Sequence, residues 1–474
     1  MTGAIRADLC VIGAGSGGLS VAAGAAQMGA RVVLIEAGAM GGDCLNAGCV
    51  PSKALIAAAH HARAMTAGGP FGVAPVAPRV DFAAVNDHLR GVIETIAPVD
   101  SQDRFEGLGV TVIRARARLT GRRTVAAGDA VVTARRIVIA TGSRPAIPAI
   151  PGIDTVPCLT NETVFALRDR PAHLLVIGGG PIGIELAQAH RRLGCRVTVF
   201  QKGRALGRED PDIARVVLDA LRDEGVDLLE EVEVASVSGA GGGIAVALAD
   251  GRSVEGSHLL VAAGRRVDLD GLGLEAAGVA HTARGVTVGP DLRSVTNRAV
   301  FAVGDAAGGP QFTHVAGAHA GVILRQALLG LPARFATDAI PRVTYADPEL
   351  AQVGLTEAEA RARHGARLTV IRQDFAHNDR AQATRAATGV LKLMVVRGRP
   401  VGVAIVGPQA GELIGLWQLA IAARLRLSAV AGMIAPYPTL GEISKRAAGA
   451  YFSPRLFDSP VVRRVVRAVQ RWLP

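Results

Sequence analysis

The sequence predicts an α/β protein with two βαβ units and a further C-terminal domain. Two glycine-rich fingerprints, at residues 8–36 and 174–201, carry this prediction, because each follows an apolar strand and opens a helix. The composition agrees, since 58 glycines among 474 residues suit tight βα turns and close packing of helices on sheets. A chain of this length also favours about three domains.

The first fingerprint begins with the apolar strand at residues 8–12 and ends at Glu36. Gly13 allows the tight turn, Gly15 lets the backbone approach a pyrophosphate, and Gly18 permits close contact between helix and strand. Glu36 ends the second strand and can bind a ribose hydroxyl. GxGxxG alone is a weak signal, so the flanking strand and helix and this acidic residue are what predict a Rossmann-like dinucleotide site.

A second fingerprint of the same kind follows the strand at residues 174–177. Its glycines are Gly178, Gly180 and Gly183, and a helix and the strand at 195–200 come next. The chain is therefore predicted to bind two dinucleotides in two Rossmann-like units.

The two fingerprints differ at the residue that is expected to contact the ribose of the bound dinucleotide. Where the first has Glu36, the second has Gln201, with Lys202 and Arg204 close behind. A carboxylate would repel the 2′-phosphate of NADPH, whereas an amide followed by cations can accept it. This favours NADPH over NADH, and the alternative is that the two cations only solvate a loop.

Two cysteines stand five positions apart, just ahead of an apolar helix. A disulfide needs Cα atoms within about 4.4–6.8 Å, and the four residues between Cys44 and Cys49, Gly48 among them, can fold back that far. Pro51 suits a first helical turn, so the positive end of the helix lies near Cys49 and favours its thiolate. The pattern predicts a redox-active disulfide. A structural disulfide or zinc half-site is the alternative, but further zinc ligands at motif spacing are missing and no metal site is expected.

Composition limits the function classes. The chain has a formal net charge of +11 but only 3% aromatic residues, and basic stripes interleaved with aromatics are missing, so no nucleic-acid partner is expected. A strand begins almost at once without a secretory leader, which predicts a cytoplasmic protein. The apolar stretch 414–434 contains Arg424 and Arg426, which favours a packed helix over a membrane span.

The thirteen residues 41–53 read GGDCLNAGCVPSK. They resemble the GGxCxNxGCxPSK signature of the flavin- and pyridine-nucleotide-dependent disulfide oxidoreductases, the family of glutathione reductase, dihydrolipoamide dehydrogenase and mercuric reductase. Other blocks follow in the family's order from about residue 8 to 446. The resemblance implies FAD at the first fingerprint, NAD(P)H at the second, and a C-terminal α+β domain that forms a homodimer. The implied domains are 1–150 and 266–335 for FAD, 151–265 for NAD(P)H, and 336–474 for dimerisation.

The resemblance also implies roles for side chains. Cys49 holds a thiolate against the flavin, while Cys44 attacks or binds a small thiol-reactive acceptor. Lys53 lies near flavin N5 and is held there by Glu185, with a surface ion pair as the alternative. Asp305 contacts the ribityl chain of FAD. Further cofactor contacts are implied for Gly42, Lys53, Thr141, Gly142, Gly264 and Gly304.

One block departs from the relatives that reduce dithiols. Those relatives carry a histidine and a later glutamate that reach across the dimer as an acid–base pair, whereas this chain has Tyr437 and Glu442. A phenol, with a pKa near 10, does not suit proton shuttling at neutral pH. Mercuric reductases resemble the chain in having a tyrosine, although no cysteine follows Cys195 here, where those enzymes carry a C-terminal pair. A mercuric-reductase-like enzyme is predicted, and a dihydrolipoamide-dehydrogenase-like or other disulfide reductase is the alternative.

The C-terminal residues 460–473 place valines and Trp472 on one face of a helix and four arginines on the other. Packing on its own domain or on the dimer partner is the first interpretation, and contact with an anionic membrane is the second. A non-enzymatic alternative is a membrane-peripheral protein with a vestigial flavin fold. The intact Cys44, Cys49 and Lys53 argue against it.

Overall fold

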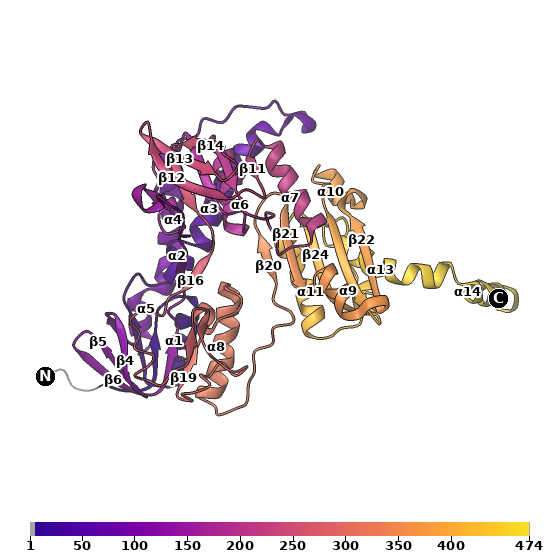
Figure 1. Cartoon of the computed structure of the whole chain (residues 1–474). Helices are drawn as coiled ribbons and strands as arrows, with labels where there is room; N and C mark the ends of the chain where they lie inside the picture. Colours follow the sequence, from indigo (N-terminus) through magenta and orange to yellow (C-terminus); the bar gives the residue numbers. More distant parts are fainter. Residues whose placement is uncertain (1–4, 474) are drawn as a thin grey trace. The chain divides into compact units, whose positions relative to one another are not determined.

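The computed structural model describes residues 5–473, which form two compact units. The first unit holds residues 5–178, 189–200 and 233–336, and the second holds 179–188, 201–232 and 337–473. Figure 1 labels the elements along the chain.

The main sheet of the first unit has the strand order β3-β2-β1-β6-β5-β4, and β19 also pairs with β6. The strands β3, β2, β1, β6 and β19 run parallel, whereas β5 pairs antiparallel with both β4 and β6. The near-continuous apolar runs of β1 and β2 suit parallel strands covered on both faces. The bounds are β1 (Ile5–Ile12), β2 (Val32–Glu36), β3 (Thr111–Arg114), β4 (Ala117–Gly121), β5 (Thr124–Ala127), β6 (Ala130–Ile139) and β19 (Val300–Ala302).

Helices bring the cysteine motif to the carboxyl end of this sheet. The helix α1 joins β1 to β2 in the first βαβ unit and packs against α8, as Figure 1 shows. The cysteines follow β2, in α2 and at the start of α3. The helices are α1 (Ser16–Gln27), α2 (Gly42–Asn46), α3 (Cys49–Thr66), α4 (Phe82–Asp100), α5 (Gln102–Gly107) and α8 (Thr313–Ala327).

A second parallel sheet carries the second fingerprint. In the first unit its strand order is β10-β9-β15-β8, and α6 (Pro181–Arg192) links β9 to β10. An antiparallel sheet β12-β13-β14 and the pairs β16-β7 and β17-β18 complete the unit. The bounds are β7 (Ser143–Pro145), β8 (Cys158–Leu159), β9 (His173–Ile177), β10 (Arg196–Phe200), β12 (Val234–Ala240), β13 (Gly243–Leu248), β14 (Ser253–Gly256), β15 (His258–Val261), β16 (Arg265–Val267), β17 (His281–Thr282) and β18 (Gly285–Val286).

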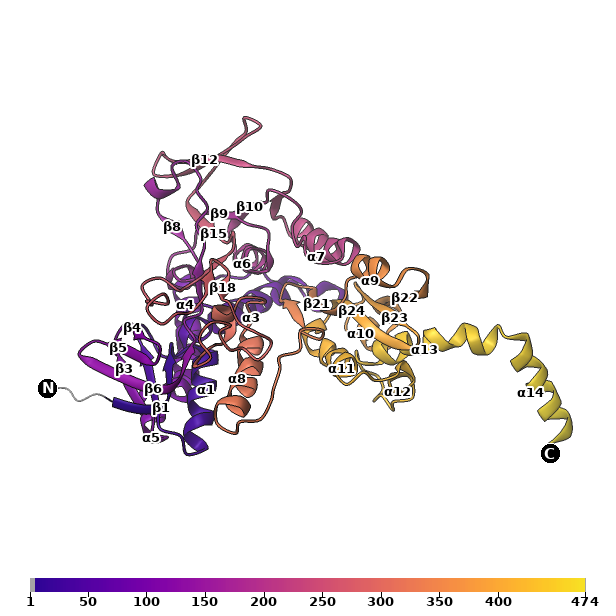
Figure 2. The same cartoon turned by 60° about the horizontal axis from the view of Figure 1, so that its bottom comes forward.

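The second unit is organised around the antiparallel sheet β20-β21-β24-β23-β22. The helix α11 packs on β21 and β24, and α13 packs on β22; Figure 2 shows this group from a second side. Trp417 of α11 is fully buried, and its indole Nε1 donates to Ser444 Oγ of α13 at 3.1 Å. The bounds are α7 (Pro211–Asp223), β11 (Asp227–Leu229), β20 (Arg342–Thr344), β21 (Glu349–Gly354), α9 (Glu357–His364), β22 (Leu368–Asp374), α10 (Asp379–Ala383), β23 (Val390–Val396), β24 (Arg399–Gly407), α11 (Ala410–Ala422), α12 (Leu427–Ala431), α13 (Glu442–Phe457) and α14 (Pro460–Trp472).

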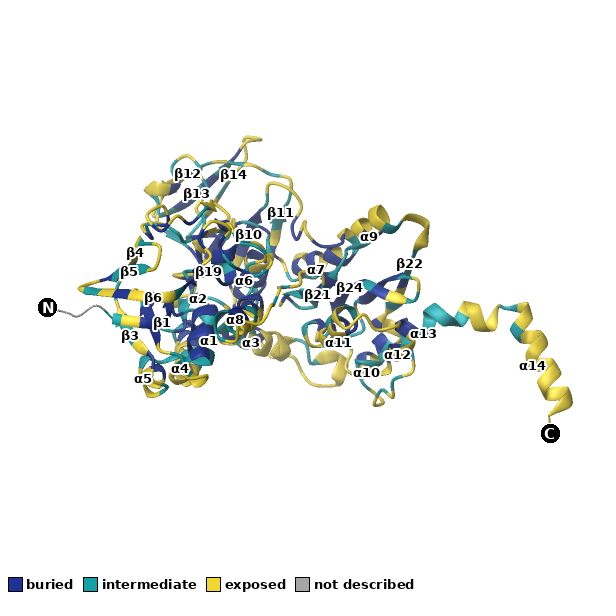
Figure 3. Cartoon of the chain, turned by 90° about the horizontal axis from the view of Figure 1, so that it is seen from below, coloured by how far each residue is buried: buried dark blue, intermediate teal, exposed yellow. Residues whose placement is uncertain are grey.

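The apolar stretch 414–434 forms two helices instead of the single packed helix that the sequence suggested. The helix α11 ends at Ala422, Arg424 adopts a left-handed backbone with φ 52°, and α12 starts at Leu427. Figure 3 colours α14 as mainly exposed, whereas inner strands such as β10 and β24 are mainly buried.

Candidate active site

The loop that carries the cysteines is held by its own backbone and by one amide side chain. Asn46 Nδ2 donates to the carbonyl oxygens of Met40 and Gly42, at 3.0 and 2.8 Å. A side chain at Gly48 would place its Cβ 2.9 Å from the carbonyl oxygen of Asp43, so the return between the two cysteines needs glycine there. The sequence therefore folds this loop back on itself in a few residues.

This turn brings the two cysteines together as free thiols. Cys44 lies in α2, Cys49 is the first residue of α3, and the two side chains are hydrogen-bonded. Thr313, at the start of α8, places its Oγ1 3.6 Å from Cys49 Sγ. The arrangement is the reduced, dithiol state of the predicted redox pair.

The environment separates the pKa values of the two thiols. The hydrogen bond from Cys44, followed by that from Thr313 and the charge of Lys53, lowers the pKa of Cys49 to about 6, although burial opposes the shift. The same hydrogen bond and burial raise the pKa of Cys44 well above its usual range. Near neutral pH the pair therefore holds one thiolate, on Cys49, and one protonated thiol, on Cys44.

A chain of polar contacts runs from the cysteine loop to Asp305. Arg265 Nη2 lies 3.1 Å from Asp43 Oδ2, and its Nε donates to Ser143 Oγ at 2.8 Å. Ser143 in turn donates to Asp305 Oδ2 at 2.5 Å. Asn161 Nδ2 holds the other oxygen of Asp43 at 2.9 Å. Arg265 and Asn161 thus hold the Asp43 carboxylate, which is next to Cys44 in the chain, from two directions.

Sequence reasoning assigned no role to Asp43, Ser143, Asn161, Arg265 or Thr313. Asp43 lies in the cysteine motif, and Ser143 and Arg265 directly follow residues with implied cofactor contacts, which was the available signal. Asn161 lies in no motif, and its contact with Asp43 spans 118 positions of the chain.

The second fingerprint repeats the geometry of the first. A Cβ on Gly178, whose φ is +116°, would lie 2.4 Å from the carbonyl oxygen of Ala262. The backbone N–H of Gly179 donates to Gln201 Oε1 at 2.7 Å. The oxygen of this side chain is therefore engaged by the protein's own backbone. Lys202 and Arg204 follow it at the surface.

The remaining predicted residues of the fingerprints lie at turns and helix starts. Gly180 precedes α6 and Gly183 lies in its first turn, while Gly142 follows β6, Gly264 precedes β16 and Gly304 opens a 3₁₀ turn after β19.

Glu185 is buried in α6, and its Oε1 accepts the backbone N–H of Tyr345 at 2.8 Å. Its predicted pairing with Lys53 stays a prediction, because the two residues belong to different compact units.

Tyr437 and Glu442 lie at one end of α13 in the second unit. Tyr437 is 69% exposed, and its hydroxyl donates to Asp379 Oδ2 at 2.9 Å. That hydrogen bond raises the pKa of the phenol. Glu442 lies 3.9 Å from Arg446, and within residues 5–473 its buried Oε2 has no hydrogen-bond partner. The tyrosine is thus a donor held to a carboxylate and not a base.

A cavity of about 370 Å³ reaches Cys44. Ser16, Leu45 and Thr313 line it near the cysteine, and Asp100, Arg104 and Phe105 line it further along. Burial raises the pKa of Asp100. The cavity therefore adjoins both the start of α1 at the first fingerprint and the protonated thiol of Cys44.

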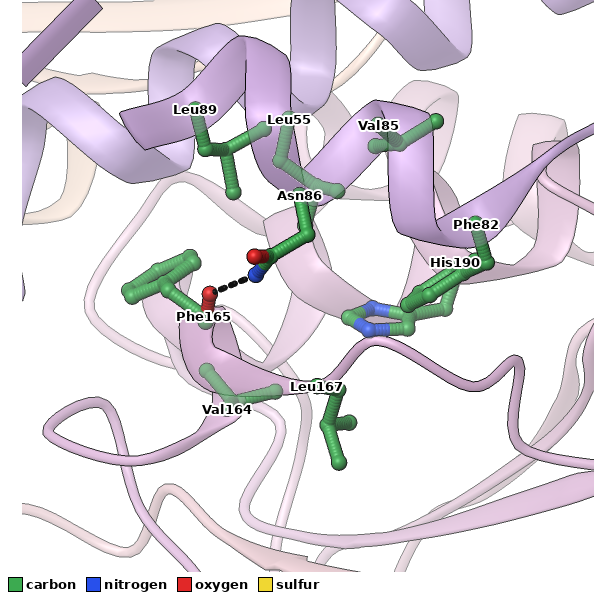
Figure 4. A pocket seen from close by; sticks show the side chains of 9 residues that line it. All are labelled: Leu55, Phe82, Val85, Asn86, Leu89, Val164, Phe165, Leu167 and His190. Atoms are coloured by element: carbon green, nitrogen blue, oxygen red, sulfur yellow. Dashed lines mark hydrogen bonds between the residues drawn. The ribbon is translucent and has the colours of Figure 1, made fainter. Parts of the chain in front are cut away.

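A second cavity, of about 10 Å³, lies between α4 and the segment 164–167 (Figure 4). Asn86 Nδ2 donates there to the carbonyl oxygen of Phe165 at 2.6 Å, and the rings of Phe82 and His190 stand 6.0 Å apart. It has room for about one water molecule, so it is a packing defect and not a substrate site.

Comparison with known proteins gives the family. Residues 7–320 match the pyridine nucleotide-disulphide oxidoreductase model, and residues 340–448 match the dimerisation domain of the same family. The chain belongs to the pyridine nucleotide-disulphide oxidoreductases. The predicted family and fold class are therefore confirmed.

Members of this family resemble the chain over most of its length. Mercuric reductase of Streptomyces lividans is 35% identical over 460 residues, covering 94% of this chain and 96% of that protein. Dihydrolipoyl dehydrogenase of Geobacillus stearothermophilus is 34% identical over 458 residues, with the same coverage of 94% and 96%. The structure of a Cu(II) complex of RclA, an HOCl-induced flavoprotein disulfide reductase from Escherichia coli, is 28% identical and superposes with a TM-score of 0.83, covering 92% of this chain and 98% of that one.

The family depends on FAD and a nicotinamide nucleotide, and the first fingerprint fits FAD. Gly15 caps α1 without a side-chain hydrogen bond, which leaves backbone N–H groups for a pyrophosphate. A Cβ on Gly42 would lie 2.6 Å from the Cα of Gly15, so this cradle admits only glycine. Glu36 Oε2 accepts the N–H of Ala14 at 2.6 Å. Thr141 Oγ1 is buried and has no hydrogen-bond partner within residues 5–473.

As a disulphide oxidoreductase with the family's dimerisation domain, the chain forms a homodimer. Within residues 5–473 no helix is both long and apolar enough to cross a membrane. The same residues contain no group of three or more His, Cys, Asp or Glu side chains placed to hold a metal ion.

Proposed function

We propose that this flavoenzyme uses NADPH to reduce a small thiol-reactive acceptor, and that the acceptor is a soft metal ion bound by thiolates, as in mercuric reductases. The observation that carries the proposal is Tyr437, which occupies the acid–base position and is hydrogen-bonded to Asp379. Relatives named mercuric reductase support it, at 32–36% identity. The proposal includes the domain division 1–150, 151–265, 266–335 and 336–474, and a cytoplasmic location.

The proposed preference for NADPH depends on the end of β10. Gln201 keeps its oxygen on the N–H of Gly179, so the groups it offers to a ribose are donors. A 2′-phosphate accepts hydrogen bonds, and Lys202 and Arg204 add positive charge nearby. The first fingerprint instead ends in the carboxylate of Glu36.

Bound FAD would supply the chemistry that accepts a hydride from the nicotinamide and delivers two electrons to the cysteine pair. The protein then offers a thiolate on Cys49 and a thiol on Cys44 beside the cavity. With a disulfide acceptor, Cys44 must lose its proton to attack one sulfur, and the leaving thiolate must gain one. Cys49 then attacks Cys44 and releases the second thiol. This route needs a group that moves protons near neutral pH.

Reduction of a thiolate-bound metal ion requires less proton transfer than reduction of a disulfide. Cys44 and Cys49 replace two thiolate ligands, and the proton of Cys44 leaves with one of them, so no bond between sulfurs has to break. Two further electrons, which a second NADPH would supply through bound FAD, reduce the metal ion. Both cysteines are left as thiolates, and Cys44 regains one proton from water. The phenol of Tyr437 has a raised pKa and cannot act as a base, yet this chemistry does not need one.

Reduction of lipoamide or another small disulfide is the second candidate. One observation favours it: dihydrolipoyl dehydrogenase of Geobacillus stearothermophilus is 34% identical. The cavity at Cys44 would also admit a small disulfide.

One assay separates these candidates. Anaerobic NADPH oxidation by the FAD-loaded enzyme is measured with mercuric ion in excess thiol, with Cu(II), with lipoamide and with glutathione disulfide. We expect turnover with the thiolate-bound metal ion and slow turnover with both disulfides. Faster turnover with lipoamide than with the metal ion would replace the first candidate by the second.

A further inference from the structure

The last helix of the chain stands apart from the oxidoreductase machinery. The match to the dimerisation domain ends at residue 448, whereas α14 spans Pro460–Trp472. Ser459 Oγ accepts the N–H of Val462 at 3.3 Å, and Pro460 occupies the first turn. The helix therefore has its own start signals. All its residues are exposed except Val462, which is partly buried.

The exposed surface of α14 is divided into two faces. At about 100° per residue, one face collects the apolar side chains and the other collects the arginines. Trp472 is 77% exposed and Val461 is 59% exposed, although both lie on the apolar face. Figure 3 shows this helix in the colour of exposed residues along most of its length. The apolar face consists of Val461, Val462, Val465, Val466, Val469, Trp472 and Leu473, and the basic face of Arg463, Arg464, Arg467 and Arg471.

The positive charge of α14 limits which partners can cover its exposed faces. Residues 460–474 contain four arginines and neither aspartate nor glutamate. A second copy of the chain carries the same net charge of +11, so long-range electrostatics disfavour its approach. A nucleic acid would attract the arginines but would leave the valines and Trp472 in water. An anionic lipid surface accommodates both faces, because headgroups attract cations while the acyl boundary takes apolar side chains.

We propose that α14 docks this enzyme on membranes that contain anionic lipids. The helix lies in the plane of the interface, with its valines and Trp472 toward the acyl chains and its arginines among the headgroups. One helix of this length binds weakly, but a homodimer presents two, so the second contact forms at a high effective concentration. The cysteines and both nucleotide fingerprints precede α14 in the chain, so a chain that ends before α14 retains all of them.

The test is flotation of the purified, FAD-loaded dimer with vesicles. Phosphatidylcholine vesicles are compared with vesicles that also contain phosphatidylglycerol, at low salt and at high salt. We expect binding to the anionic vesicles alone, and loss of that binding at high salt because the attraction is screened. Trp472 reports insertion by a blue-shifted emission, since Trp417 is fully buried in either state.

Two variants separate charge from apolar contact. Arg463→Glu with Arg467→Glu should weaken binding at least about 25-fold, since each of the two lost cations contributes about fivefold. The matched control is Arg363→Glu with Arg367→Glu, which has the same spacing and charge change on exposed residues around α9. It should keep vesicle binding. Val465→Asp with Val469→Asp should abolish binding while leaving all four arginines in place.

Two results would overturn the proposal. Equal vesicle binding by a chain ending at Ser459 would place the lipid contact elsewhere. Failure of the full chain to bind anionic vesicles, together with dissociation of the shortened chain into monomers, would show that α14 packs on a second copy. Flavin content and NADPH oxidation by the shortened chain show that it has folded.

Discussion

At the scale of single residues, the contacts of Cys49 set its chemistry. The hydrogen bond from Cys44 is the largest cause of its lowered pKa, and Thr313 adds a second donor. Both donors stabilise the thiolate, so the reduced enzyme should be alkylated at Cys49 with a midpoint near pH 6. Iodoacetamide labelling followed by mass spectrometry measures this midpoint.

Removing the hydrogen-bond donors to Cys49 should raise the pH midpoint of its alkylation. Cys44→Ala should shift it furthest, and Thr313→Val should shift it less, because a thiolate that loses a donor holds its proton to higher pH. Cys158→Ser is the control, since Cys158 donates to the carbonyl oxygen of Ile153 and has no part in the pair. A native midpoint at the ordinary thiol pKa would contradict this assignment.

The preference for NADPH over NADH is also predicted to depend on one residue, Gln201. Gln201→Glu keeps an oxygen for the N–H of Gly179 but replaces the amide donor by a negative charge. We expect the KM for NADPH to rise about tenfold or more, which corresponds to about 1.4 kcal/mol, while the KM for NADH stays or falls. Stopped-flow reduction with both nucleotides tests this. An unchanged preference would show that the phosphate is read elsewhere.

At the scale of elements, a buried lysine ties α7 and α9 to the sheet of the second unit. Lys392 of β23 is 2% exposed, and its Nζ lies 2.6 Å from Asp212 and 3.0 Å from Glu357. Asp210, which precedes α7, is 3.6 Å away. Lys392→Met should destabilise the fold by about 3–5 kcal/mol, because the buried Asp210 loses its cation and Asp212 and Glu357 each keep only an arginine. Arg372→Met removes a half-exposed partner of Asp212 and should cost less than about 1 kcal/mol.

The loss of stability caused by Lys392→Met should depend on pH. Burial already raises the pKa of Asp210, and loss of the lysine raises it further, so protonation of this carboxyl favours the fold at low pH. The difference in Tm from the native enzyme should therefore narrow as the pH falls from 7 toward 4. Calorimetry at several pH values measures it, and a constant difference would mean that the lysine acts through packing alone.

Local sequence predicted the elements around the site better than the contacts between them. The glycine fingerprints and the cysteine turn depend on neighbouring residues, so their geometry could be anticipated from spacing and backbone sterics. The bond from Thr313 to Cys49 joins residues 264 positions apart, and the Arg265 bond to Ser143 joins residues 122 apart. Contacts between residues so far apart in the chain leave no periodic pattern in the sequence. The break near Arg424 was missed for a related reason, since a non-glycine residue there adopts φ 52° inside an apolar run.

At the scale of the whole molecule, the dimer is predicted to complete the site. In this hypothesis Tyr437 of one subunit faces the cysteines of the other. Tyr437→His would then restore a titratable group beside Glu442 and should raise turnover of lipoamide at least about tenfold near neutral pH, since general acid–base groups typically contribute ~10²–10⁴-fold. Tyr437→Phe is the control and should not raise it. Turnover of a thiolate-bound metal ion should stay the same in both variants.

Hybrid dimers show whether the gain crosses the subunit boundary. If one subunit carries both Cys44→Ser and Tyr437→His and the other is native, the intact cysteines meet the new histidine and lipoamide turnover should rise. If one subunit carries Cys44→Ser and the other carries Tyr437→His, the intact cysteines meet a tyrosine and the gain should vanish. Differently tagged subunits, co-expressed and purified through both tags, provide the two hybrids for the same NADPH assay. The opposite pattern, with the gain in the second hybrid alone, would place Tyr437 beside the cysteines of its own subunit and would remove the cross-subunit site from the proposed mechanism.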